Sequence, residues 1–364
     1  MQDPKRMRLW AQSWRVMARR AILTKEPETV PPSLRLRASL ALAAAVLTGV
    51  RTSLWVSREL KARDFDQVWF AARVLFSGGN PYQQIGPGRA FDWPAPLYYP
   101  LTAVLAISPL ALAPRIVANV LFAMLGSAAF VWAATRRSIG PAVVITSASA
   151  ALAAEAVQWS PLLGAAFGIS WLAILLSAKP TIGFAVWVAR PSLRAVIGAL
   201  VLSLIALVLL PRWPLDWLAA LRYTSLAKAG GTPYLSPAGT LGGMSVVLLL
   251  ARWRRPEARL VLALACVPQT PLLYETVPLF LVPLSLTEGG ILWLGSWIAA
   301  AWVAVSGPFP SELARFTTSA RAIGWCMYLP CVMMILRRPN VGTDSVMPPV
   351  PLQWLGSRVP KIAP

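Results

Sequence analysis

The sequence predicts an all-α membrane protein that crosses the bilayer many times. Hydrophobic residues make up 57% of the chain and charged residues only 13%, against roughly 45–50% and ~25% in ordinary soluble domains. Apolar runs recur along most of the 364 residues, and several approach or exceed the ~18–20 residues that one helix needs to cross a bilayer. Because these runs are continuous rather than alternating, they are not the strands of a membrane β-barrel. A soluble enzyme, a disordered chain and a disulfide-stapled secreted domain are excluded on the same grounds.

The chain is strongly basic, with 34 Lys and Arg residues against 14 Asp and Glu residues. Nine of the basic residues precede the first apolar run, and others form short clusters between runs, as at Arg252, Arg254, Arg255 and Arg259. Basic residues near span ends orient a protein in the bilayer and attract anionic headgroups, so we expect membrane lipids, and no nucleic acid, as partners. The chain has no histidine, which excludes histidine-ligated metals and histidine acid–base chemistry.

The apolar runs divide the chain into a basic arm, a membrane domain and a tail. Residues 1–38 predict a cytoplasmic N-terminal arm, and residues 337–364 a cytoplasmic polar tail. Residues 39–336 between them predict a transmembrane domain with two extracytoplasmic polar loops, 58–97 and 212–236. The apolar runs lie near 39–57, 98–113, 116–135, 141–157, 161–178, 180–189, 193–211, 237–251, 258–268, 271–287, 290–307 and 320–336. The runs 180–189 and 258–268 are too short to cross alone and predict half-helices or continuations.

The basic clusters also predict the orientation of the chain. With the N-terminus inside, loop 58–97 lies outside and Arg190 and Arg194 return inside, as cytoplasmic basic residues should. The same count leaves Arg136 and Arg137 outside. Either that pair faces extracytoplasmic water or one nearby run is re-entrant.

Loop 58–97 carries the first candidates for chemistry. After Asp66, apolar residues recur at helical spacing up to Phe76, and a Gly-Gly-Asn-Pro stretch then ends the pattern; this predicts a short amphipathic helix on the membrane surface. Asp64 and Asp66 stand at the start of this helix. Their carboxylates could cap its free N–H groups, or one could act as a general base that Arg63 and the helix N-terminus keep ionised. Two residues are available for the two roles.

Four motifs follow one another along the chain. They are Asp64-Phe65 with Trp69-Phe70-Ala71-Ala72-Arg73 and Gly78-Gly79-Asn80-Pro81-Tyr82; Tyr98-Tyr99-Pro100-Leu101 with Ser108-Pro109-Leu110; Ser177-Ala178-Lys179-Pro180-Thr181-Ile182-Gly183; and Thr270-Pro271-Leu272-Leu273-Tyr274-Glu275. In this order they resemble motifs of the family-87 glycosyltransferases, GT-C-type mannosyltransferases of bacterial envelopes that use polyprenol-phosphate-mannose. In that family a His usually follows the acid of the last motif, whereas this chain has Thr276, so any role of that His is absent or has moved.

The resemblance implies a GT-C-type bundle of about 10–12 transmembrane helices with extracytoplasmic surface helices. It implies an inverting transfer of a sugar, mannose in the family, from a polyprenyl-phosphate donor to a hydroxyl of a lipid or glycan acceptor. An aspartate of the first loop would deprotonate that hydroxyl, and the Ala-Ala-Arg stretch aligns Asp64 with it, with Asp66 as the runner-up. The site would face the extracytoplasmic side of a bacterial inner membrane.

Further residues are candidates for binding the substrates. Lys179 is the first candidate for the donor phosphate, because an intramembrane lysine is costly unless it is used, although it could instead snorkel to the interface. The weaker phosphate candidates are Arg63, Arg212, Arg222 and Lys228, of which the last three belong to a predicted surface helix in loop 212–236. The candidates for the acceptor or sugar are Asp66, Tyr82, Tyr98, Tyr99 and Glu275. The tyrosines could equally anchor the chain at the interface, and Glu275 could equally form a structural ion pair.

We therefore expect a monomeric integral-membrane glycosyltransferase that needs no metal or other cofactor, since no cluster of acids suggests a divalent-metal site. The alternative is a transporter or flippase of a lipid-linked glycan, which broken helices and basic cavity residues would serve equally well. The acids of loop 58–97 distinguish the glycosyltransferase from the flippase, because a flippase needs no general base at one face of the membrane. A scaffold subunit without chemistry is disfavoured by Lys179 and Glu275, which are costly within apolar runs unless used or paired.

Overall fold

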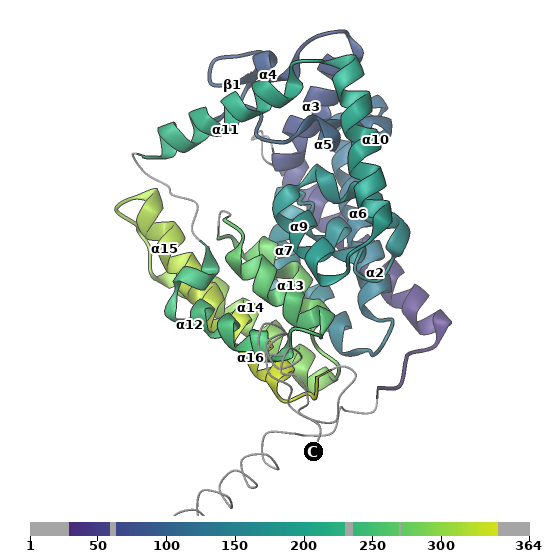
Figure 1. The fold of residues 1–364 in the computed structure, drawn as a ribbon, viewed down its shortest axis with the longest axis vertical. Coiled ribbons are helices and arrows are strands. Elements are labelled where there is room, and N and C mark those ends of the chain that lie inside the picture. Colours follow the sequence, from purple (N-terminus) through teal and green to yellow (C-terminus); the bar gives the residue numbers. More distant parts are fainter. Residues whose placement is uncertain (1–28, 59–62, 230–235, 269–270, 341–364) are drawn as a thin grey trace, which may run out of the picture.

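The computed structural model describes residues 29–58, 63–229, 236–268 and 271–340 (Figure 1). Their secondary structure is helical, apart from the paired parallel strands β1 (Ile85–Gly86) and β2 (Phe91–Asp92). The α-helices are α2 (Leu34–Arg58), α3 (Asp64–Phe76), α4 (Pro81–Gln84), α5 (Leu101–Ala106), α6 (Arg115–Ala134), α7 (Ala148–Ala156), α8 (Ser160–Ala165), α9 (Pro180–Ala189), α10 (Leu193–Leu209), α11 (Trp213–Ala229), α12 (Leu241–Met244), α13 (Pro256–Cys266), α14 (Leu286–Val305), α15 (Glu312–Ile323) and α16 (Leu329–Leu336). Tighter 3₁₀ segments are η1 (Ser108–Leu112), η2 (Gly140–Thr146), η3 (Ser170–Ala178), η4 (Pro237–Gly239), η5 (Ser245–Arg252) and η6 (Leu273–Leu281), and η7 (Gly324–Tyr328) is a π-helical turn.

Within the described residues, four helices are long and apolar enough to cross a membrane. They are α2, α6, α14 and the continuous helix Glu312–Leu336, which α15, η7 and α16 form together. Helix α10 and the first part of α11 would make a fifth span if counted as one, but they meet at a bend of 98°. The chain thus has the all-α architecture and the long apolar helices of a membrane protein.

Most of the other predicted apolar runs are divided into shorter helical pieces. Of the roughly 10–12 expected transmembrane helices, four or five are therefore present as long apolar helices within the described residues. Proline is the physical reason, since it lacks an N–H and fixes φ. Pro161, Pro180 and Pro256 each stand in the first turn of a short helix, and Pro278 lies within η6. The two short runs are confirmed as separate helices, α9 and α13, which pack against each other.

The run 98–113 does not form a crossing helix. Helix α5 has six residues, and η1 follows it after one residue. The end of the run returns to α3, where the Ala113 carbonyl accepts a hydrogen bond from Trp69 Nε1 at 3.1 Å and the Ala111 carbonyl accepts one from Arg73 Nη1 at 3.3 Å. This run is therefore the re-entrant one.

The re-entrant run also decides between the two alternatives for Arg136 and Arg137. Both lie close enough to Arg190 to repel it, and Arg136 also repels Arg37 near the start of α2. Arg136 donates to the Gly168 carbonyl at 3.3 Å. The pair is thus on the same side as Arg37, because run 98–113 turns back instead of crossing.

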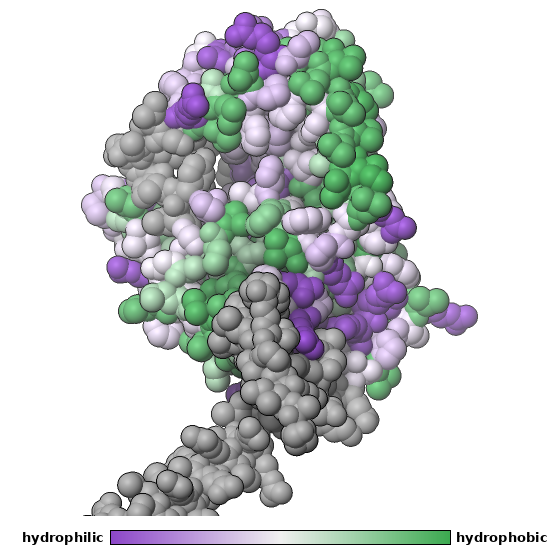
Figure 2. All heavy atoms as spheres, viewed as in Figure 1, coloured by the Kyte–Doolittle hydropathy of each residue, from purple (hydrophilic) through white to green (hydrophobic). Residues whose placement is uncertain are grey.

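The molecule has two chemically different ends (Figure 1). We call the end formed by α3, α4, β1, β2 and α11 the loop end. We call the opposite end, which carries Arg37, Arg136, Arg137, Arg190 and Arg194, the basic end. Hydrophilic side chains gather at the basic end in Figure 2, and hydrophobic side chains cover the length of α10 between the two ends. This distribution suits a bundle whose middle faces lipid.

The helices predicted in the two polar loops are present as α3 and α11, and they are joined at the loop end. Asn80, just before α4, donates to Asp216 of α11 at 2.9 Å, and Trp217 Nε1 donates to the Tyr98 carbonyl at 2.9 Å. Phe65 of α3 is fully buried and stacks on Phe122 of α6, with ring centroids 4.4 Å apart. These contacts place both polar loops over the same end of the bundle.

Candidate functional site

Helix α3 begins with the two aspartates that the sequence singled out, and the structure gives them different surroundings. Asp66 is fully buried, and its Oδ2 accepts a hydrogen bond from the Arg63 backbone N–H at 2.7 Å, which closes a capping box at the start of the helix. Its Oδ1 accepts from Asn119 at 2.7 Å and lies 3.3 Å from Arg115 Nε. Oδ2 of Asp66 therefore caps the start of α3 and Oδ1 fixes α3 against α6, and these structural partners disfavour Asp66 as the base or as a sugar ligand.

Asp64 is the first residue of α3 and is partly exposed. Its Oδ2 accepts a short hydrogen bond from the side-chain amide of Gln158, and the Tyr274 hydroxyl also interacts with the carboxylate. Asp64 lies outside the candidate membrane-spanning helices. Burial raises its pKa, against the opposing effects of the Lys179 charge and the Gln158 hydrogen bond. A carboxylate with a raised pKa is a stronger base than an ordinary aspartate.

Gln158 is aimed at Asp64 by a strained turn at the end of α7. The preceding residue, Val157, is fully buried and has φ of 51°, in the left-handed region that β-branched residues rarely adopt. Such a conformation costs on the order of 1–3 kcal/mol and persists only where the surroundings impose it. The turn directs the buried Gln158 amide toward Asp64 on one side and Lys179 on the other.

Lys179 stands at the junction between η3 and α9, where Pro180 opens the next helix. Its Nζ donates to Gln158 Oε1 at 3.0 Å and to Glu275 Oε1 at 2.5 Å, and it lies 5.6 Å from the centre of the Tyr274 ring. The Glu275 side chain is only 7% exposed, and that of Lys179 is 16% exposed. Lys179 is therefore held in an ion pair and does not snorkel to the interface, although part of its side chain remains exposed.

We call Asp64, Gln158, Lys179, Tyr274 and Glu275 the polar cluster. Its members come from α3, the α7–α8 turn, the start of α9 and η6, which lie far apart in the sequence. The cluster offers a partly exposed carboxylate and a partly exposed ammonium group, joined through one buried amide. Such a set can accept a proton at one point and stabilise a developing negative charge at another.

The three candidate tyrosines lie around the polar cluster, but they do not all offer a free hydroxyl. Tyr98 and Tyr99 stack with ring centroids 5.2 Å apart, and the Tyr98 hydroxyl accepts from Gln67 at 3.4 Å. Tyr82 is buried and donates its hydroxyl to the Tyr99 carbonyl at 3.0 Å. Tyr82 and Tyr99 therefore form a wall of the site, and Tyr98 is the one of the three that remains partly exposed.

The weaker phosphate candidates do not converge on the polar cluster. Arg63 lies over the Trp55 ring and donates to the Trp55 carbonyl at 3.4 Å. Arg212 and Arg222, at α11, are exposed at the loop end. Lys228 falls in the part of α11 whose side chains are outside the described residues.

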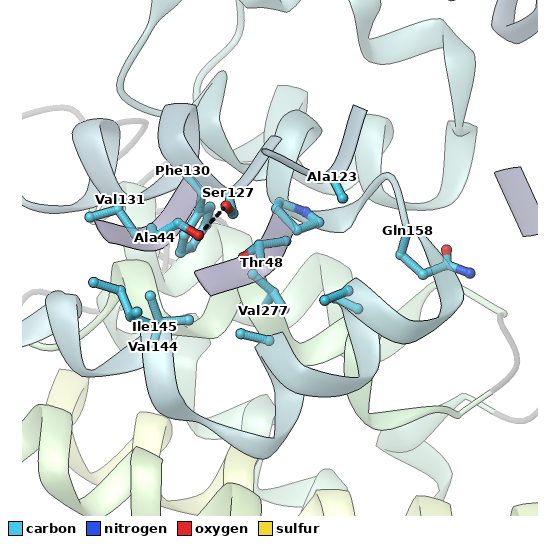
Figure 3. A pocket seen from close by; sticks show the side chains of 14 residues that line it. Ala44, Thr48, Ala123, Ser127, Phe130, Val131, Val144, Ile145, Gln158 and Val277 are labelled. Carbon is cyan, nitrogen blue, oxygen red and sulfur yellow. Dashed lines mark hydrogen bonds between the residues drawn. The ribbon is translucent and has the colours of Figure 1, made fainter. Parts of the chain in front are cut away.

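A small void in the core borders the polar cluster without being part of it (Figure 3). It has a volume of about 20 Å³ and an almost wholly apolar lining from α2, α6, α7 and η6. Gln158 lies at one end of it, with its amide turned away from the other labelled side chains in Figure 3. A space of this size holds about one water molecule, so it is not a substrate site.

Sequence reasoning missed Gln158 and did not assign a role to Tyr274. The available signal for Gln158 was a single amide between two apolar runs, which is costly in a membrane unless satisfied. Within the described residues, no group of three or more metal-ligating side chains is placed to hold a metal ion.

Comparisons of the chain with models of protein families, with curated protein sequences and with solved structures give no match. The resemblance to the family-87 glycosyltransferases therefore depends on the four motifs. Three of those motifs meet in the polar cluster, through Asp64, Lys179 and the Tyr274-Glu275 pair.

Proposed function

We propose that the chain is an integral-membrane inverting glycosyltransferase of a bacterial inner membrane, which uses a polyprenyl-phosphate sugar, such as polyprenyl-phosphate mannose, as donor. The observation that carries the proposal is the polar cluster, in which one partly exposed carboxylate lies one amide away from an ammonium group. The location of the cluster supports it as well. Cytoplasmic loops are enriched in Lys and Arg, so the basic end faces the cytoplasm and the loop end faces outward.

In the proposed reaction Asp64 removes the proton of the acceptor hydroxyl as its oxygen attacks the anomeric carbon. The bond between that carbon and the phosphate oxygen breaks, the configuration inverts, and polyprenyl phosphate leaves. Lys179 has three N–H donors, of which Gln158 and Glu275 take two. The third is available for the phosphate, whose negative charge increases as it leaves. Glu275 holds the ammonium group in place.

An apolar groove gives the prenyl chain of the donor a place to lie. It has a volume of about 480 Å³ between η3, α9 and α10, and its lining includes Ser177 and Pro180, which lie within two residues of Lys179 in the sequence. Exposed apolar side chains of α10 continue it toward lipid. A donor whose chain occupied this groove would bring its phosphate to Lys179.

The direct test is transfer by purified protein in nanodiscs, with radiolabelled polyprenyl-phosphate sugars and a lipid extract as acceptor source. We expect Asp64→Asn to abolish transfer, by at least the 100-fold to 10,000-fold typical of a lost general base. The matched variant Asp66→Asn should keep turnover in whatever fraction remains folded. Normal transfer by folded Asp64→Asn protein would disprove the assignment of the base. Wild-type protein that moves the labelled lipid across the bilayer without transferring sugar would favour the flippase.

A further inference from the structure

We propose that the loop end carries a second pocket that binds a carbohydrate, and that it holds a non-reacting sugar of a glycan acceptor. The role in acceptor binding rests on the proposed function, whereas sugar binding can be measured without it. We call this the outer pocket and define it by five of its lining residues, Tyr82, Gln83, Arg89, Asp216 and Tyr223.

The outer pocket lies between the segment that follows α4 and the helix α11, so the two polar loops build it together. Its volume is about 370 Å³, within the range of roughly 300–1,000 Å³ that small-molecule sites occupy. It differs from the apolar groove of the donor in both position and lining, because neither Lys179 nor its neighbours take part in it.

The lining is fixed before any ligand binds. Asp216 accepts a hydrogen bond from Asn80 at 2.9 Å through one of its two oxygens. Arg89 donates through Nη1 to the Tyr82 carbonyl at 2.6 Å. The first contact ties the two loops together and the second fixes Arg89 within its own loop. A preorganised lining loses little entropy when it binds.

The chemistry of the lining selects a polyhydroxylated ring. Asp216 can accept hydrogen bonds, Arg89 can donate them, and the exposed Gln83 amide can do both. Sugar hydroxyls likewise donate and accept. The ring of Tyr223 is 52% exposed, and its face can pack against the C–H face of a pyranose, as aromatic rings do with other apolar surfaces.

Two other ligand classes fit the outer pocket poorly. An acyl or prenyl chain would remove water from Asp216 and Arg89 without replacing their hydrogen bonds, which is costly. A phosphate would meet the negative charge of Asp216 as well as the positive charge of Arg89. A neutral sugar satisfies both groups at once.

A wall of two tyrosines separates the outer pocket from the polar cluster. Tyr82 lines the pocket, and its hydroxyl donates to the Tyr99 carbonyl at 3.0 Å. Tyr99 in turn interacts electrostatically with Asp64. A glycan with two or more sugars can therefore lie with one ring in the outer pocket and its reacting end on the Asp64 side of this wall.

The test is saturation-transfer difference NMR of α-linked mannobiose with wild-type protein in nanodiscs, with no donor present. We expect saturation of one sugar ring by the wild type, and a loss of at least fivefold in Tyr223→Ala and in Asp216→Ala. Trp171→Ala, which removes another exposed aromatic side chain on η3, is the matched control and should keep the full signal. Asp64→Asn should keep it too, because binding in the outer pocket does not require the base.

Three outcomes would overturn the inference. They are no saturation with wild type, an unchanged signal in both pocket variants, or a signal that Asp64→Asn removes and Tyr223→Ala keeps. Failure of sugar transfer by wild-type protein would overturn the proposed function instead, and it leaves the binding measurement intact.

Discussion

Asp64 and Asp66 lie in the same turn of α3, but their oxygens meet different partners. Asp66 is surrounded by donors from the backbone, Asn119 and Arg115, and water does not reach it. Asp64 meets one amide and one phenol and remains partly exposed. A carboxylate that satisfies structural donors stabilises the fold, whereas one that is partly desolvated and still accessible is suited to proton transfer.

We therefore predict that matched asparagine substitutions separate stability from activity. Asp66→Asn places an amide donor against Asn119 and Arg115 and breaks the capping box, at a cost of about 1–3 kcal/mol. Asp64→Asn should change stability little, because burial already disfavours the charged form of that side chain. The midpoint of thermal unfolding in detergent, followed by tryptophan fluorescence, measures both. Equal destabilisation by the two variants would contradict the division of roles.

The pH dependence of transfer should report the raised pKa of Asp64. The base works only when it is ionised, so activity is lost as the pH falls through its pKa, and burial moves that loss to a higher pH than an ordinary aspartate would give. Gln158→Leu removes a hydrogen bond that favours the ionised form. We expect this variant to move the acid limb of kcat/KM further toward high pH. A limb that stays in place would show that Gln158 does not act on Asp64.

At the scale of elements, the junction of η3 and α9 decides where Lys179 lies. The two segments meet at Lys179-Pro180, and they approach so closely that Gly183 of α9 touches the Leu176 carbonyl. A Cβ atom at position 183 would overlap that oxygen. Glycine is thus required here by a close backbone approach, and the approach fixes the direction from which Lys179 reaches Glu275.

Gly183→Ala should therefore impair transfer without touching any substrate. The added methyl group forces α9 away from η3 and shifts Lys179 relative to Gln158 and Glu275. We expect a fall in kcat/KM of at least tenfold and a lower unfolding midpoint. The control is Gly290→Ala in α14, where a Cβ meets open space and alanine should stabilise the helix by about 0.5–1 kcal/mol. Equal activity of the two variants would refute the role given to the junction.

At the scale of the whole molecule, the two ends support the proposed assignment of the sides of the membrane. The re-entrant run 98–113 keeps the loop end on one side and brings Arg136 and Arg137 to the other. The basic end then carries the arginines of several connections together, which agrees with the enrichment of basic residues in cytoplasmic loops.

This arrangement predicts a simple accessibility pattern. In a background with Cys266, Cys326 and Cys331 replaced by Ala, Gln84→Cys at the loop end should react with a membrane-impermeant maleimide in intact spheroplasts. Arg136→Cys at the basic end should react only after the membrane is permeabilised. Labelling of both positions in intact spheroplasts would contradict the re-entrant run and restore the count of one crossing for each apolar run.

The sequence alone determined the features that depend on local composition and spacing. Its apolar runs predicted a helical membrane protein, and the pattern after Asp66 predicted α3, since a helix and its breakers are encoded by residues a few positions apart. Its motifs also singled out Asp64, Lys179 and Glu275. None of these patterns distinguishes a run that crosses from a run that turns back, so the sequence left the side of Arg136 open between two alternatives.

The tertiary structure alone decided which of these residues meet. Gln158 is 94 positions from Asp64, and Glu275 is 96 positions from Lys179, so no local pattern could pair them. Asn119 and Arg115, the partners that hold Asp66 against α6, likewise lie more than 45 positions away, whereas its capping bond to Arg63 is local. Such contacts depend on how broken helices pack around prolines and glycines. That packing is a property of the folded bundle, because each contact forms only when segments distant in the chain bury their faces together.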